Sequence, residues 1–389
     1  MLRSLYSGIS GLRSHQTMLD VTGNNIANVN TAGFKGSAVQ FQDTLSQTQN
    51  AGTGAGDGTG ATNPAQVGLG VKVAGITTNF TQGAGQATGR ASDLMISGDG
   101  FFAVRNGGET TYTRAGAFDF GPDGRLTTTD GSLVQGWSAV NGVLNPNGAV
   151  GDITLPTKAV SNPVVTERAT IAGNLPSDSA VGTVFTRDLA VFDAAGNSTS
   201  MPISFTKTQV GWNVSGPAGA ADTTSLVYTN GVLQNPTDVR TVGGVTIDFS
   251  GTTEFAKLNT FAITAQSGRA AGTLTGYSIG ADGVVTGTFS NGATESIAQI
   301  ALATFANAAG LEKVGGSNYR TSPSSGAAEL GTPGSDGVGS LAGGYLEMSN
   351  VDLSQEFTNL IVAQRGFQAN ARIITTSDEV LQELTNLKR

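Results

Sequence analysis

Two amphipathic segments at opposite ends of this 389-residue chain constrain its fold more than any other feature. Residues 1–27 and 350–389 each repeat apolar side chains at the 3-4 spacing of a helix that packs along one seam. The seam positions are Leu5, Ile9, Leu12, Leu19, Ile26, Leu353, Phe357, Leu360, Phe367, Ile374 and Leu381. An isolated amphipathic helix of this length is marginal in water. We therefore expect the two helices to pair as a coiled coil, which brings the chain ends together.

The sequence also marks where these helices end and begin. An Asn-rich run, residues 24–30, and then Gly33 follow the first stripe. Asn and Gly tolerate the left-handed conformation that ends helices, so the first helix should stop there. Asp352 precedes the second stripe and is a capping residue, with Gln355 three positions later to reach back to it.

The segment between the helices has the composition of a β protein. It carries most of the 56 glycines, with Asp-Gly and Asn-Gly pairs that favour tight turns between strands. Strand-like apolar runs occur at 101–104, 201–207 and 245–249. We predict a mixed, mainly β fold in which nested β domains are inserted between the N- and C-terminal α-helices.

This nesting predicts four parts, most of them built from two separated stretches of chain. They are a terminal helical domain (1–27 and 350–389), a connecting segment with a Gly-rich loop (28–70 and 341–349), an inner β domain (71–155 and 273–340) and an outer β domain (156–272). The middle domains have enough alternating apolar residues to fold alone, whereas the helices depend on each other.

Composition excludes several classes of function. The net charge of −8 argues against nucleic-acid binding, which needs clustered Lys and Arg. The absence of Cys excludes disulfides and thiolate metal sites. No apolar run is long enough for membrane insertion, and the amphipathic N-terminus does not have the apolar core of a cleaved signal peptide.

Catalysis has little support in the residues. The single histidine, His15, lies in the first helix, where we interpret it as a surface or interface residue. The candidate acids Asp99, Asp123, Asp130 and Asp282 each precede a glycine, which a turn explains. We therefore expect no enzyme activity, no cofactor and no metal. A secreted β-rich adhesin or enzyme is the alternative from another class, and it leaves the two terminal heptads unexplained.

Three groups of residues resemble the flagellar basal-body rod and hook protein family. The first is the family signature after the first helix, comprising Asn24, Asn25, Ile26, Ala27, Asn28, Thr31, Gly33, Phe34 and Lys35. The second, at 98–104, 112–116 and 134–137, looks like the first β domain of that family. The third, at 349–354 and 362–365, matches its second terminal helix. Blocks at both ends in the right order make the resemblance specific.

The large middle insertion indicates which branch of the family the chain resembles. Rod proteins are shorter, and residues 156–272 look like the extra outer domain of hook subunits. The resemblance implies a structural subunit that polymerises into a flexible curved tube, a universal joint that transmits torque from rod to filament. A distal rod subunit of the basal body, which would form a straight tube, is the alternative within the family.

The resemblance also implies a location and a set of partners. The protein would be exported through the flagellar type III export apparatus without a cleaved signal peptide, and would lie outside the cell in the flagellar hook. Its first partner would be further copies of itself in a helical homopolymer. The others would be the distal rod protein, the hook cap protein, the hook-filament junction protein and the hook-length control protein.

Overall fold

The computed structural model describes residues 2–52, 54, 60–140, 142–155, 160–217, 224–234, 239–335 and 337–387. Part of the predicted Gly-rich loop, residues 53 and 55–59, lies outside the described residues. The chain forms two compact units. Unit 1 contains Met1–Leu155, Ser278–Thr286 and Ser296–Arg389, and unit 2 contains Pro156–Tyr277 and Gly287–Glu295. The finer division into four parts stays a prediction.

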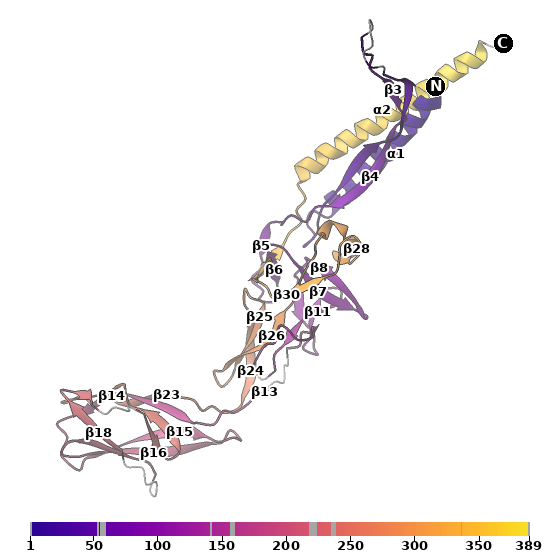
Figure 1. The fold of residues 1–389 in the computed structure, drawn as a ribbon. Coiled ribbons are helices and arrows are strands. Elements are labelled where there is room, and N and C mark those ends of the chain that lie inside the picture. The colour runs from indigo at the N-terminus through magenta and orange to yellow at the C-terminus, as the bar shows by residue number, and fades with distance from the viewer. Residues whose placement is uncertain are drawn as a thin grey trace. The chain divides into compact units, whose positions relative to one another are not determined.

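Two long helices form one end of unit 1. Helix α1 spans Leu2–Ala27 and helix α2 spans Leu353–Asn386, and they lie side by side (Figure 1). Asp352 caps α2 as expected, because its carboxylate accepts hydrogen bonds from the amides of Ser354 at 2.8 Å and Gln355 at 3.3 Å. Gln355 does not reach back, since its side chain donates to Asn359 instead. The predicted class, mainly β with two terminal helices, is confirmed.

A long antiparallel ribbon packs beside α1. Strand β1 (Ser37–Asp43) pairs with β4 (Val71–Thr78), and both strands contact α1. The ribbon continues into β2 (Ser46–Asn50) and β3 (Ala65–Gly68), which pair with each other and are exposed along their whole length. The first part of the connecting segment is therefore an extended arm along the helix and not a compact domain.

The β region of unit 1 contains a main sheet of short strands around β7 and β11, and two separate two-stranded sheets. Strand β7 (Phe101–Asn106) forms a hairpin with β8 (Glu109–Thr113) and also pairs with β11 (Leu133–Ser138). The remaining strands are β5 (Gly85–Ala87), β6 (Leu94–Ser97), β9 (Phe118–Phe120), β10 (Leu126–Thr128), β12 (Gly151–Asp152), β27 (Leu302–Thr304), β28 (Glu312–Gly315), β29 (Asn318–Arg320), β30 (Glu329–Gly331), β31 (Ser340–Gly343) and β32 (Tyr345–Glu347), with a short 3₁₀ helix η1 at Ala308–Gly310.

The two returning strands close this region. Strand β31 pairs with β6, and β32 pairs with β5, so the segment that leads into α2 is held in the β region by backbone hydrogen bonds. An aromatic cluster fills the core of this region, in which Phe101 makes edge contacts with Phe80, Phe305 and Tyr319 at centroid distances of 5.3, 5.6 and 6.0 Å. Edge-to-face rings stabilise a core beyond the area they bury.

Unit 2 is built almost entirely from one stretch of chain. Its strands are β13 (Val160–Ser161), β14 (Arg168–Pro176), β15 (Val184–Phe192), β16 (Ser198–Lys207), β17 (Gly211–Ser215), β18 (Thr224–Thr229), β19 (Val232–Leu233), β20 (Val239–Val242), β21 (Val245–Asp248), β22 (Thr252–Phe255) and β23 (Ala262–Gln266). The chain passes from unit 1 to unit 2 after Leu155, and the other boundaries fall within β24 (Gly272–Ile279), β25 (Val284–Phe289) and β26 (Thr294–Ile300).

The strands of unit 2 enclose an apolar core of their own. Strands β15 to β18 form an antiparallel meander, and β14 pairs in parallel with β21 and β22. Phe205, Phe249 and Phe261 meet at the centre with Trp212, and all four side chains are fully buried. Alternating residues of β16, namely Met201, Ile203 and Phe205, contribute to this core, as a period of two predicts.

Candidate assembly site

The helix pair of unit 1 is antiparallel and has a single register along its length. Asn25 donates a hydrogen bond to Glu356, His15 lies against Gly366, and Asn370 lies against Gly11. The numbers of each pair, 25 and 356, 15 and 366, and 11 and 370, add up to 381, so the two helices keep this alignment over at least four turns.

Small and polar residues form the buried face of this pair. The buried residues of α1 are Gly8, Gly11, Ser14, Thr22 and Asn25, and the buried residue of α2 is Ala363. Small side chains let two helix backbones approach closely, so this contact is made with little apolar area. Small residues therefore supply the most deeply buried part of the intrachain helix contact.

The predicted seam residues lie beside this buried face. Leu5, Leu12, Leu19 and Ile26 are half-buried on α1, as are Leu360, Phe367, Ile374 and Leu381 on α2, while Ile9, Leu353 and Phe357 are exposed. In α1 three buried residues, Gly8, Gly11 and Asn25, each directly precede a seam residue, which corresponds to a rotation of about 100° around the helix. The role of the seam in self-assembly stays a prediction.

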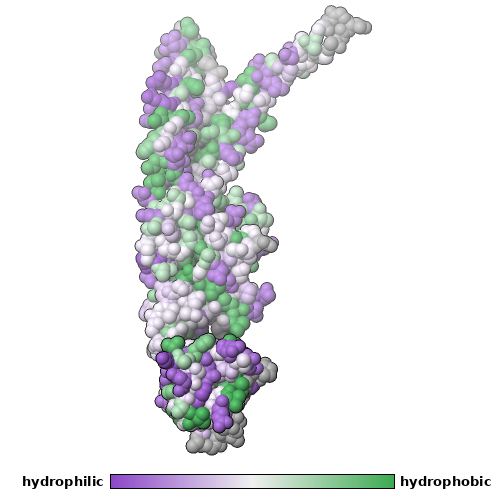
Figure 2. Space-filling view, turned by 90° about the vertical axis from the view of Figure 1, so that its left-hand side faces the viewer, coloured by the Kyte–Doolittle hydropathy of each residue, from purple (hydrophilic) through white to green (hydrophobic). Residues whose placement is uncertain are grey.

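Exposed apolar side chains continue along α2. Phe357 is 52% exposed, and the others of this kind on α2 are Leu353, Ile361, Val362, Ile373, Val380, Leu384 and Leu387. Figure 2 shows hydrophobic residues at the surface in the upper part of the view, where the helices lie. Contiguous apolar surface of this kind marks an interaction site, whereas single exposed apolar residues need no explanation.

The family signature lies where the chain leaves α1 for the β region. Asn25 bonds Ser37 in both directions, since its amide donates to the Ser37 carbonyl at 2.8 Å and its carbonyl accepts from the Ser37 amide at 3.0 Å. Asn28 donates to Asn24, and Thr31 donates to Asn28, which stabilises the turn that follows the helix. These bonds fix the direction in which the chain leaves the helix.

Gly33 has a backbone that other residues adopt only with strain. Its φ is +69°, and a Cβ atom added to it would lie 2.4 Å from the amide nitrogen of Ala115. Its own amide donates to the carbonyl of Glu347 at 2.7 Å. The signature glycine therefore lets the outgoing chain touch both the β region and the strand that returns to α2.

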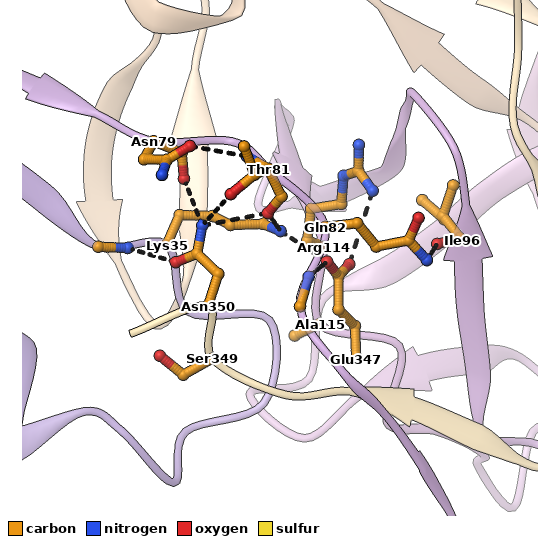
Figure 3. Close-up of polar contacts among 12 residues, drawn as sticks. Lys35, Asn79, Thr81, Gln82, Ile96, Arg114, Ala115, Glu347, Ser349 and Asn350 are labelled. Carbon is orange, nitrogen blue, oxygen red and sulfur yellow. Dashed lines mark hydrogen bonds and ion pairs between the residues drawn. The ribbon is translucent and has the colours of Figure 1, made fainter. Parts of the chain in front are cut away.

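Two buried cations share one buried carboxylate at this junction (Figure 3). Lys35 donates to Glu347 Oε1 at 2.6 Å and to the carbonyl of Thr81 at 2.7 Å. Arg114 lies 3.6 Å from Glu347 Oε2, and the amide of Gly83 donates to Oε1 at 2.8 Å. Burial lowers the pKa of Lys35 and of Arg114, and Glu347 opposes this by favouring their charged forms.

Asn350 completes the junction from the returning strand. Its side-chain amide donates to the carbonyls of Asn79 at 2.9 Å and Thr81 at 3.1 Å, and its carbonyl accepts from the amide of Gly36 at 2.9 Å (Figure 3). The outgoing segment after α1 and the incoming segment before α2 are thereby bonded to each other. The junction holds both helices to the β region at one place.

The other signature residues have lesser parts. The ring of Phe34 lies 5.1 Å from the ammonium group of Lys313, a cation–π contact, and that group also donates to the carbonyl of Lys35 at 3.1 Å. Ile26 is half-buried, and Ala27 is exposed as the last residue of α1.

Sequence analysis did not assign a site role to Arg114, Glu347 or Asn350. Glu347 had a signal that could have found it, because it is the only charged residue between Asp336 and Asp352. Glu is mostly exposed in proteins and is almost never fully buried unless it is paired, so this isolation was only a weak signal. Its partner Lys35 is 312 positions away, so the sequence did not show which cation it meets.

The described residues hold no cluster of three or more His, Asp or Glu side chains arranged to bind a metal ion. Within the same part of the chain, no helix is long and apolar enough to cross a membrane.

Three protein-family models match the N-terminal, middle and C-terminal parts of the chain. "Flagella basal body rod protein" matches residues 5–35, "Flagellar hook protein FlgE/F/G D1 domain" matches 95–171, and "Flagellar basal body rod FlgEFG protein C-terminal" matches 342–387. The first match contains α1 and the signature turn, and the third contains β32, Asn350 and α2. Lys35, Arg114, Glu347 and Asn350 of the junction each lie within a matched segment.

Whole-length relatives give the same result. The chain is 39% identical to flagellar hook protein FlgE of Borreliella burgdorferi over 442 aligned residues, with all of both chains covered. It is 35% identical to FlgE of Escherichia coli, with 98% of each chain covered. It is also 38% identical over 390 residues to flagellar basal-body rod protein FlgG of Bacillus subtilis, again with both chains fully covered. A solved structure, flagellar hook protein FlgE2 of Helicobacter pylori, covers 68% of this chain at TM-score 0.49 and 14% identity.

Terminal helices around a β region, with the signature turn at their junction, define an axial protein of the bacterial flagellum. The chain belongs to the flagellar hook protein FlgE family. It is a structural subunit of the flagellar hook, and the family implies that it polymerises with copies of itself.

Proposed function

We propose that the terminal helices build the inner wall of a flexible, curved tube that acts as a universal joint and transmits torque from rod to filament. The observation that carries this proposal is the apolar surface left on α2 after the intrachain contact is made, including Phe357 and Ile361. Contacts that repeat head to tail between identical subunits continue as a helix and do not close. Apolar helix faces therefore bury themselves against further copies.

Electron microscopy of hooks from cells that carry altered chains tests this role. Deleting residues 1–27 should abolish tubes, because α2 then has no partner helix and no second seam. Substituting Gln364 by Ala, on an exposed part of α2, is the control and should leave tubes intact. Normal tubes from the deleted chain would refute the proposal.

Unit 2 is the part of the chain that we assign to the outer layer of that tube. We propose residues 156–272 as the outer domain, whose contacts slide as the tube bends, with the inner β domain beneath it. Surfaces poor in charge and rich in small polar residues suit sliding, because no single anchor fixes the contact. Replacing residues 157–270 by a short linker should leave tubes that form but no longer curve as the parent does. Unchanged curvature and supercoiling would contradict this role.

We propose an extracellular location in the hook and export through the flagellar type III apparatus without a cleaved signal peptide. The proposed partners are the distal rod protein, the hook cap protein, the hook-filament junction protein and the hook-length control protein. The amphipathic α1, with its polar face, is unlike a signal peptide and supports export without cleavage. Mass spectrometry of secreted protein should find the α1 sequence intact, and a shortened N-terminus would contradict the proposal.

The rod alternative keeps one specific observation in its favour, the similarity to the Bacillus subtilis rod protein over the whole chain. Chain length does not separate this protein from that relative. A straight, stiff tube in electron micrographs would favour the rod role, and a curved tube favours the hook. We further propose that the chain has a structural role only and no enzyme activity, as its hook relatives' names describe structural proteins.

A further inference from the structure

We propose that His15 and Asn370 set the register of the terminal helix pair. Each places the tip of its side chain against a glycine of the opposite helix. A Cβ atom added to Gly366 would lie 2.5 Å from Cε1 and Nε2 of His15, and one added to Gly11 would lie 2.8 Å from the side-chain nitrogen and oxygen of Asn370. Both distances are well below van der Waals contact, so each glycine is the space that the opposing side chain fills.

Glycine destabilises a helix at interior positions such as 11 and 366. In a helix interior it is about 1 kcal/mol less favourable than alanine, so flexibility alone does not explain it in a helix that must pair. Gly23 of α1 shows the difference, because a Cβ atom there would meet no atom within 4 Å. Gly11 and Gly366 therefore differ from Gly23 in that a side chain of the opposite helix lies against each of them.

The His15–Gly366 and Asn370–Gly11 contacts lie one helical turn apart along the helix pair. His15 follows Gly11 by one turn on α1, and Asn370 follows Gly366 by one turn on α2. The Asn370 amide also donates to the carbonyl of Gly366 at 2.9 Å, which links the two steps. From the other side, the ring of Phe41 on β1 makes an edge contact with His15 at 5.8 Å between centroids.

Two leucine-rich helix faces can shift past each other by one heptad and still pack leucine on leucine. The contacts of His15 and Asn370 with glycine are lost in such a shift. A shift by one heptad in one direction would place His15 opposite Ile373 and Asn370 opposite Met18, so each polar tip would meet a long apolar side chain in place of a glycine. Polar residues at seam positions specify register in coiled coils for this reason. The half-buried leucines nearby add attraction without choosing the alignment.

The tube readout below rests on the proposed assembly of the helices, and the cross-linking readout does not. Gly366→Ala should lower the yield of sedimentable hooks about tenfold, as expected for overpacking by one methyl group. Gly23→Ala is the matched control, and it should keep or raise the yield because alanine favours the helix. Adding His15→Ala to Gly366→Ala should restore most of the lost yield, since truncation of the imidazole vacates the space.

Cysteine pairs read the register directly, because the chain contains no Cys. A Cβ atom at Gly8 would lie 3.4 Å from Cγ1 of Ile374, so Gly8→Cys with Ile374→Cys should form a disulfide in the full chain. Gly8→Cys with Leu381→Cys, one heptad away, should not. Gly366→Ala should reduce the first cross-link and raise the second.

Two results would overturn the proposal. One is Gly366→Ala and Gly23→Ala giving the same yield and the same cross-links. The other is His15→Ala failing to offset Gly366→Ala while both single changes are damaging. If the parent chain and Gly23→Ala form no tubes but cross-link in register, the assembly proposal fails and the register proposal stands.

Discussion

Unit 2 and the terminal helix pair bury their side chains in opposite ways. Unit 2 closes the apolar residues of its described strands into one core, in which Trp212 and Phe205 are fully buried. The helix pair buries glycine, serine, threonine and asparagine, and leaves Phe357 and Ile361 more than half exposed. One region therefore satisfies its own apolar surface, and the other needs further molecules to do so.

This difference separates folding from assembly within one chain. A closed core folds without partners, whereas a helix with exposed apolar residues gains most of its stability from packing. We expect unit 2 to stay folded in the free subunit, and the helix pair to keep its register there but to be only marginally stable until assembly covers its apolar face. The ion pair of Lys35 and Glu347 is fully buried within one chain, so its stability should not depend on assembly.

The largest difference in stability should appear when a phenylalanine is replaced by alanine in unit 2 and, separately, in the terminal helix pair. Phe205→Ala removes a fully buried ring and should lower the free energy of unfolding of unit 2 by about 3–5 kcal/mol. Phe357→Ala should change the unfolding free energy of the subunit by less than about 0.5 kcal/mol but reduce tube yield. Urea unfolding followed by tryptophan fluorescence, with sedimentation of tubes, measures both. Equal unfolding costs would remove the distinction.

Lys35→Met should have the next largest effect. It leaves Glu347 buried without its nearest cation, which should cost about 3 kcal/mol of stability in unit 1. Arg90→Met is the control, since the Arg90–Asp119 pair is exposed and should contribute less than about 1 kcal/mol. Thermal unfolding of both variants tests the ranking, and similar losses would mean that the junction is not a buried anchor.

A pH-dependent loss should follow from Tyr228 in unit 2. Burial raises the pKa of Tyr228 from 10.0 to about 12, and its hydroxyl contacts that of Thr252 at 2.8 Å. A raised pKa stabilises the fold fully below pH 10, and that contribution of at most about 3 kcal/mol is lost as the pH rises from 10 to 12. Unfolding of the parent and of Tyr228→Phe across this window should show a steeper loss in the parent. Parallel curves would contradict the assignment.

The smallest effect should be at the start of α2. Asp352→Ala removes the helix cap and should destabilise the assembled helix by about 1 kcal/mol. Asp352→Asn keeps an acceptor and should cost less. The depolymerisation temperature of purified tubes reports this change, and unit 2 should be unaffected in both variants. A larger effect on unit 2 than on the tubes would reverse the comparison.

Periodicity and turn chemistry predicted the elements well where the signals are local. The heptads and Asp352 located both helices, because helix periodicity and capping depend on residues within one turn of each other. The Asn-rich run and Gly33 located the end of α1 for the same reason. The period does not say which residues of a helix are buried most deeply, and in α1 these are small or polar residues beside the predicted seam.

The sequence by itself determined that this is a mainly β protein with two terminal helices and a family signature at their junction. Only the tertiary structure showed that Gly8 and Gly11 of α1 and Gly366 of α2, each next to a seam residue, lie against the opposite helix. It alone brought Lys35 to Glu347 across 312 positions. The reason is physical: local patterns fix the conformation of a segment, whereas close approach of backbones and pairing of buried charges depend on residues that meet only after folding.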